Sequence, residues 1–242
     1  MNKTLLALSV ALAGIAAPSL ASAELVFNAG VTTDYRYRGI SQSRLKPALQ
    51  GGVDFSEGGF YLGAWASSIK WIKDGGGGAS VELDLYGGYK GELAKDLGFD
   101  VGVLSYQYPS NGLSPSANTT EVYGALSFGP ATLKYSHSLS KLFGFANSKN
   151  SGYLDLSASF DVGGGVSLAP HLGYQRVSGN SNLSYTDYAL TASMEVAKGL
   201  TASLAVVGAS TKSIGGAKAY ASAANGKDLG KAGLVLGLKL AF

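Results

Sequence analysis

The sequence contains no cysteine, few prolines and, beyond its first residues, no long apolar run. Without cysteine the chain can form no disulfide, thiolate metal site or thiol nucleophile. Charged residues make up 14% of the chain, against roughly 25% in an ordinary soluble domain. After residue 23 no apolar stretch reaches the roughly 18 residues that indicate a spanning helix. These absences argue against a disulfide-bonded scaffold and against a helical membrane protein.

The first 23 residues have the pattern of a secretory signal peptide. A cationic start at Lys3 precedes an apolar run from Leu5 to Ala17, and Ala21-Ser22-Ala23 is a small-residue cleavage site. The alternative is an anchoring helix, but the run is shorter than the roughly 20 residues that such a helix needs. We therefore expect residues 1–23 to be cleaved and residues 24–242 to form one exported domain.

Residues 25–43 alternate with a period of two. The odd positions are apolar, small or aromatic, whereas the even positions become polar and then charged toward Arg38. Such alternation predicts a β-strand whose two faces meet different environments. The length suits a strand that crosses a bilayer at a tilt, which needs roughly 9–11 residues.

The same design recurs along the chain and predicts an all-β, closed antiparallel transmembrane barrel of twelve strands. Ten or fourteen strands remain possible, because boundaries read from sequence carry an error of about 2–4 residues. Short turns alternate with longer loops, as in bacterial outer-membrane barrels, so both termini are expected in the periplasm. The expected strands are 25–43, 47–55, 60–70, 80–90, 97–108, 119–128, 131–140, 152–161, 166–175, 185–196, 200–211 and 229–242.

Aromatic residues on the outward faces are expected to form two girdles around an aliphatic band. A soluble sandwich also alternates, but it would not leave its outward faces almost free of charge. The girdle at the short turns is predicted to contain Phe27, Phe55, Phe60, Tyr89, Phe99, Phe128, Phe160 and Phe242, and the other to contain Tyr35, Tyr37, Tyr174 and Tyr188.

Three segments carry a family resemblance. NAGVTTDYRYRGISQS at residues 28–43, PALQGGVD at 47–54 and GFYLGAWAS at 59–67 resemble the TorF-type porin family, a group of conserved hypothetical outer-membrane proteins. The resemblance implies an outer-membrane barrel that acts as a channel. It implies no substrate and no site residues, and the remaining strands fit in length without a specific motif.

The inward faces carry most of the charge, which implies water in the lumen or close pairing. A charged wall can select solutes by its field. We expect the selectivity zone to contain Asp34, Arg36, Arg38, Glu82, Asp84 and Glu121. Inward aromatic side chains either stack on solutes or fill a tapering lumen, and the candidates are Tyr61, Trp65, Tyr86, Tyr106, Tyr108, Tyr123 and Tyr153.

The sequence thus predicts an outer-membrane porin for passive diffusion of small hydrophilic solutes, with no enzyme activity, cofactor, metal or nucleic acid. The expected partners are membrane lipid, lipopolysaccharide on the basic long loops, and the barrel-assembly machinery, which would read the last strand ending at Phe242. Two alternatives stay open: a structural or adhesive barrel with a filled lumen, and a lipid-modifying enzyme. The enzyme would depend on His137, which is expected to face lipid without a serine beside it.

Overall fold

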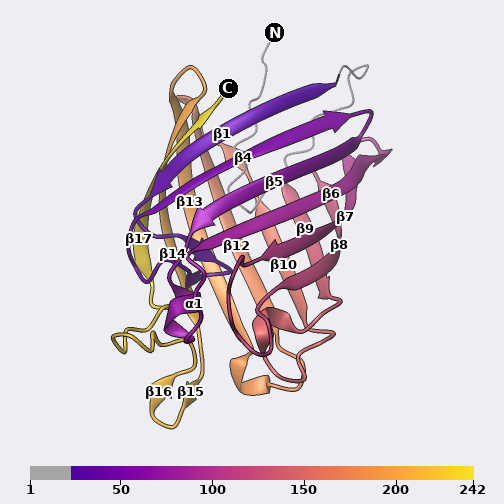
Figure 1. Cartoon of the computed structure of the whole chain (residues 1–242). Coiled ribbons are helices and arrows are strands. Elements are labelled where there is room, and N and C mark those ends of the chain that lie inside the picture. Colours follow the sequence, from indigo (N-terminus) through magenta and orange to yellow (C-terminus); the bar gives the residue numbers. More distant parts are fainter. Residues whose placement is uncertain (1–22) are drawn as a thin grey trace.

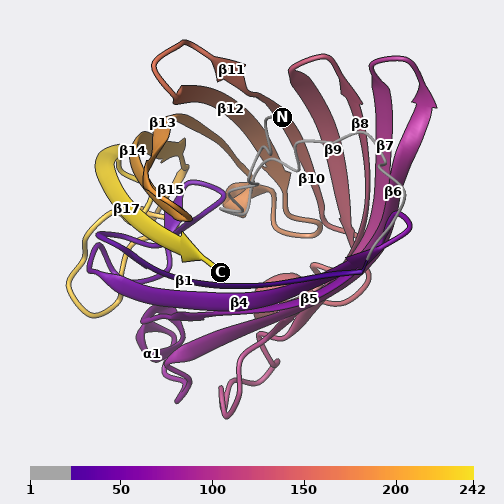
Figure 2. The same ribbon diagram turned by 90° about the horizontal axis from the view of Figure 1, so that it is seen from above.

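The computed structural model describes residues 23–242, so the apolar run of the predicted signal peptide lies outside the described residues. One antiparallel sheet closes on itself into a barrel (Figures 1 and 2). The first strand, β1 (Glu24–Thr32), pairs with the last, β17 (Gly233–Ala241). The short β11 (Phe160–Asp161) continues β10 (Gly152–Ala158) beyond Ser159, and both pair with β12 (Val166–Arg176).

Twelve strands therefore form the barrel wall, as predicted. The other eight are β4 (Ala48–Glu57), β5 (Phe60–Ser68), β6 (Val81–Ala94), β7 (Leu97–Gln107), β8 (Thr119–Phe128), β9 (Ala131–Ser138), β13 (Tyr185–Ala197) and β14 (Leu200–Ser210).

Short turns join the strands at one end of the barrel and long loops join them at the other; these are called the short-turn end and the long-loop end. Figure 1 shows the C-terminus at the short-turn end, and α1 (Trp71–Asp74) with the hairpin of β15 (Ser213–Ile214) and β16 (Ala217–Lys218) at the opposite end. The long loops also hold β2 (Arg36–Tyr37), β3 (Ile40–Ser41) and the 3₁₀ turns η1 (Leu142–Gly144) and η2 (Ser181–Leu183). Across residues 23–242 no helix is both long and apolar enough to span a membrane.

The outer wall is apolar because every second side chain points away from the lumen. At the short-turn end Phe27, Phe60 and Phe128 are exposed, and Tyr174 and Tyr188 are exposed toward the other end. Leucines and valines of neighbouring strands fill the band between them. The amide groups of Phe27 and Phe242 exchange two hydrogen bonds of 2.9 and 3.0 Å, and their rings stack 6.1 Å apart.

The first strand is shorter than predicted, and two of the predicted girdle residues are placed differently. β1 ends at Thr32, where its pairing with β4 also ends. The chain then turns into the barrel, so Tyr35 and Tyr37 are buried at 5% and 8% exposure instead of facing lipid. Their rings pack against inward aromatic side chains such as Trp65 and Tyr106. Apolar and polar residues still alternate through residues 33–37, but there the aromatic side chains contact other aromatic rings inside the lumen and not lipid.

Candidate constriction inside the barrel

The segment 33–47, here called the inward loop, crosses the lumen at the long-loop half of the barrel. Its two short strands, β2 and β3, form a hairpin whose turn is Arg38-Gly39. Both turn residues have positive φ, 46° and 78°. A Cβ on Gly39 would lie 2.6 Å from the carbonyl oxygen of Gly208 and 2.7 Å from Cβ of Asp187. The hairpin tip therefore touches the wall formed by β13 and β14, and only glycine fits there.

Asp34 holds the inward loop together from within. Its carboxylate accepts hydrogen bonds from Arg36 Nε at 2.5 Å, Ser41 Oγ at 2.5 Å and Ser43 Oγ at 3.1 Å. Arg36 also donates through Nη1 to three backbone carbonyls, among them that of Leu229 at 2.9 Å. These local bonds make a compact loop out of a segment that the sequence pattern predicted as strand.

Arg38 ties the tip of the loop to two further wall strands, β8 and β12. Its two terminal nitrogens donate to the carboxylate of Glu121 at 2.6 and 3.2 Å, and Nη1 donates to Gln175 Oε1 at 2.6 Å. The guanidinium lies over the rings of Tyr37 and Tyr153, at 4.7 and 4.1 Å from their centroids. A two-pronged pair of this kind fixes geometry as well as charge.

Glu82 and Asp84 place two buried carboxyl groups at the same level, and neither forms an ion pair within residues 23–242. Tyr35 Oη donates to Glu82 Oε1 at 2.5 Å, and Tyr108 Oη donates to Oε2 at 2.8 Å. Burial, with the nearby Glu82 and Asp84 carboxylates, raises the pKa of Tyr35 well above its usual value, so its hydroxyl remains a donor. Asp84 is 3% exposed, and its Oδ1 has no hydrogen-bond partner within residues 23–242.

The six predicted selectivity residues thus meet in one region, although three of them belong to a loop instead of a strand. Asp34, Arg36 and Arg38 enter from the inward loop, while Glu82, Asp84 and Glu121 line the wall on β6 and β8. The sequence could not show that the arginines pair with Asp34 and Glu121, because those pairs depend on how the loop folds back.

The predicted lumen aromatics divide into two groups. Tyr106, Tyr108 and Tyr153 are buried against the inward loop, and Trp65 meets Tyr35 edge to face at 5.3 Å. This group packs around the inward loop inside the barrel. The second group, toward the short-turn end, is half-buried and contains Tyr61, Tyr86 and Tyr123.

Each tyrosine of the second group lies across a glycine on the neighbouring strand. Tyr86 faces Gly63, Tyr61 faces Gly88 and Tyr123 faces Gly102 in the strand register. A Cβ on these glycines would come within 2.4 to 2.5 Å of the tyrosine ring or hydroxyl. The rings therefore lie flat on the barrel wall, an arrangement that covers glycine in sheets.

Charged groups accompany these tyrosines. Tyr61 Oη donates to Asp100 Oδ1 at 2.5 Å, Tyr86 Oη donates to Asp54, and Lys134 Nζ lies 3.7 Å from the centroid of Tyr123. Because the rings lie against the wall and carry charged neighbours, this half of the barrel has a polar lining.

Neither histidine is hydrogen-bonded to a serine within residues 23–242, although Ser157 is the register partner of His171 on β10. His171 faces the lumen as predicted: its Nε2 lies 2.8 Å from Asp187 Oδ1, and its Nδ1 lies 3.0 Å from Asp155 Oδ2. His137, on the outer wall as predicted, contacts the Tyr135 hydroxyl and Asn150 Oδ1, each at 3.3 Å. The described part of the chain holds no group of three acidic or histidine side chains placed to bind a metal ion.

The closed wall, apolar outside and polar inside, defines the class: a twelve-stranded transmembrane β-barrel of the porin fold. A family model matches residues 16–242, and the chain belongs to that family, described as bacterial protein of unknown function (Gcw_chp). No curated protein matches the sequence.

Solved structures share the fold at low identity. The chain is similar to a KdgM porin, with a TM-score of 0.56 and 7% identity over 91% of this chain and 98% of that one. A KdgM porin in complex with disordered oligogalacturonate aligns at a TM-score of 0.56 and 9% identity, over 91% and 99% of the two chains. A NanC porin aligns at a TM-score of 0.56 and 12% identity, over 90% and 99%.

Proposed function

We propose that the protein is an outer-membrane channel for passive diffusion of small hydrophilic solutes. The observation that carries the proposal is the barrel itself: its lining is polar and charged while its outer wall is apolar. A charged lining implies a hydrated path. The similarity in fold to the KdgM and NanC porins supports the same function, as does the TorF-type resemblance of residues 28–43.

The proposal includes an orientation and a set of partners. The predicted signal peptide would export the chain, the short-turn end with Phe242 would face the periplasm, and the last strand would be read by the barrel-assembly machinery. Exposed lysines of the long loops, such as Lys46 and Lys70, would then meet lipopolysaccharide phosphates by charge pairing or steer anionic solutes.

The inward loop sets the narrowest part of the proposed path. Aromatic packing around Tyr35 and Tyr37 also favours the second candidate, a structural or adhesive barrel with a filled lumen. The two differ in one measurable property, because a filled lumen passes no ions. The enzyme alternative has less support, since His137 has neither a serine nor a carboxylate within hydrogen-bond reach in the described chain.

The first prediction concerns conduction. Purified protein in a planar lipid bilayer should give discrete channel steps and a reversal potential that favours cations in a salt gradient. The reason is that lumen carboxylates outnumber lumen cations: Asp34, Asp54, Glu82, Asp84, Asp100, Glu121, Asp155 and Asp187 against Arg36, Arg38, Lys90, Lys134, His171 and Lys239. A protein that is folded by its heat-modifiable gel mobility but gives no steps would favour the filled barrel.

The second prediction assigns the cation preference to Glu82 and Asp84. The double substitution Glu82→Gln and Asp84→Asn should move the reversal potential toward zero, because it removes two lumen carboxyl groups that form no ion pair in the described chain. Glu57→Gln is the matched control, since Glu57 is exposed at the short-turn end. An equal shift in both proteins would place the selective charge elsewhere.

A further inference from the structure

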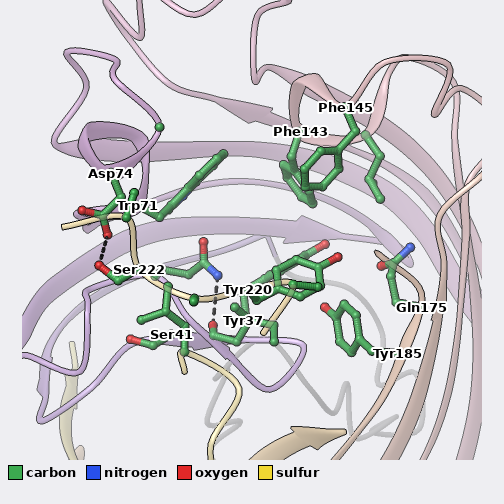
Figure 3. A pocket seen from close by; sticks show the side chains of 18 residues that line it. Tyr37, Ser41, Trp71, Asp74, Phe143, Phe145, Gln175, Tyr185, Tyr220 and Ser222 are labelled. Atoms are coloured by element: carbon green, nitrogen blue, oxygen red, sulfur yellow. Dashed lines mark hydrogen bonds between the residues drawn. The ribbon is translucent and has the colours of Figure 1, made fainter. Parts of the chain in front are cut away.

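A pocket of about 300 Å³ lies on the long-loop side of the barrel, next to the inward loop (Figure 3). Its walls come from segments far apart in the chain. α1 contributes Trp71, η1 contributes Phe143, the start of β13 contributes Tyr185, and the loop before β17 contributes Tyr220; Tyr37 of the inward loop also lines the pocket. A solute that enters from the long-loop side would meet this pocket before the constriction.

The aromatic walls are held in place by one another. Phe143 meets Tyr37 at 5.5 Å and Trp71 at 6.1 Å between ring centroids, both edge to face, and Tyr185 meets Tyr220 at 5.1 Å. Such contacts stabilise ring positions beyond simple burial. The pocket is therefore built before any ligand arrives, which lowers the entropic cost of binding.

Most polar groups around the pocket already have partners. Asp74, the one charged residue among its described lining, is bound by Arg44 and accepts a hydrogen bond from Ser222 Oγ at 2.9 Å. The Tyr37 hydroxyl donates to Tyr106, and the Tyr220 hydroxyl donates to the carbonyl of Leu183.

Three side-chain polar atoms of the lining residues have no hydrogen-bond partner within residues 23–242, and one of them, Nε1 of Trp71, is fully buried. The other two, the hydroxyl of Tyr185 and Oε1 of Gln42, remain available to a ligand, and both residues line the pocket. In Figure 3 the Tyr185 oxygen points toward the middle of the pocket. One is a donor and acceptor, the other an acceptor, so the pair suits a single polar substituent.

These features define a ligand. A cavity of about 150 Å³ holds benzene, so 300 Å³ fits one substituted ring. A charged ligand would find no free counter-charge, and a sugar would leave most hydroxyls without a protein partner. We propose that the pocket binds an uncharged solute with a single aromatic ring and one hydrogen-bonding substituent. This names a solute class for the proposed channel, but binding itself does not require conduction.

The chain holds two tryptophans, Trp65 and Trp71, and this allows a direct test. In the full-length protein with Trp65→Phe, Trp71 alone reports on the pocket. Addition of para-nitrobenzyl alcohol, an uncharged quenching ring, should give saturable quenching that benzyl alcohol relieves by competition. Cyclohexylmethanol and glucose should not compete. In the reverse variant, Trp71→Phe, the remaining Trp65 should show no saturable quenching.

A second variant ties the signal to the pocket. Tyr185→Ala in the Trp65→Phe background should weaken binding about tenfold, as expected for loss of one ring contact and one hydroxyl. Tyr188→Ala is the matched control, because Tyr188 lies on the same strand but faces outward. Quenching that rises linearly, that is equal in both tryptophan variants, or that cyclohexylmethanol or glucose relieves equally well would overturn the proposal. Because the signal is fluorescence, the pocket is tested separately from the channel.

Discussion

Replacement of Arg38 by alanine is expected to increase single-channel conductance and to destabilise the barrel by about 3–5 kcal/mol. Arg38 pins the tip of the inward loop through Glu121 and Gln175. Its loss leaves Glu121, which is 2% exposed, as a buried carboxylate without its counter-ion. The favourable response is for the loop to leave the lumen so that water reaches Glu121. Conductance steps in a planar bilayer measure the opening, and unfolding in urea measures the stability.

Two variants distinguish loss of the contacts that Arg38 makes with Glu121 and Gln175 from a general effect of lost positive charge. Arg176→Ala removes an exposed arginine whose side chain, among residues 23–242, donates only to the carbonyl of Asn150, so it should change neither measurement. Glu121→Gln in the Arg38→Ala background should recover stability, because the neutral amide leaves no buried charge. Unchanged conductance in Arg38→Ala would show that the inward loop stays in place without its pin.

The same residues carry the selectivity prediction drawn from the sequence. With Arg36→Ala and Arg38→Ala together, the reversal potential should shift toward cations, since Asp34 and Glu121 lose their arginine partners. An unchanged potential beside a larger conductance would leave the motif of residues 28–43 as a structural element of the loop.

The barrel could be predicted from the sequence because lipid and water impose a period of two on every crossing strand. Leu234, Leu236, Leu238 and Leu240 show this: all four are exposed on the outer wall. The inward loop could not be predicted in the same way. Tyr35 and Tyr37 continue the alternation of β1, but their environment is other aromatic rings of the lumen instead of lipid.

The sequence predicted which face of the barrel wall the carboxylates of the candidate site lie on, but it did not predict which residues they contact. Alternation placed Glu82, Asp84 and Glu121 on the inner face, where the structure has them. The partners of these carboxylates come from the loop, Tyr35 for Glu82 and Arg38 for Glu121. Such pairs join residues tens of positions apart, so no local pattern predicts them.

The glycine–tyrosine pairs could not be predicted from the sequence for a related reason. A glycine in a strand reads as a weak position or a close approach of another group. Only the register between β5 and β6 shows that Gly63 and Tyr86 face each other. This distinction matters for the lumen, since a ring that lies on glycine leaves more space than one that stands away from the wall.

Gly63→Ala is expected to push Tyr86 away from the wall and narrow the path. The added Cβ would lie 2.4 Å from the Tyr86 ring, and its nearest neighbours all belong to that side chain, so the ring moves while the backbone stays. The movement breaks the hydrogen bond from Tyr86 to Asp54. We expect lower conductance with discrete steps retained, and a loss of about 1–3 kcal/mol of stability from overpacking.

The pair can be tested by compensation. Gly63→Ala with Tyr86→Ala should restore or exceed the original conductance, because the displaced ring is gone. Gly124→Ala is the matched control: it adds the same methyl group to a strand glycine that is exposed, with its nearest neighbour 4.0 Å away. If Gly63→Ala lowers conductance no more than Gly124→Ala does, ring displacement is not the cause. If the conductance of the double variant stays as low as that of Gly63→Ala alone, the obstruction comes from the strand and not from Tyr86.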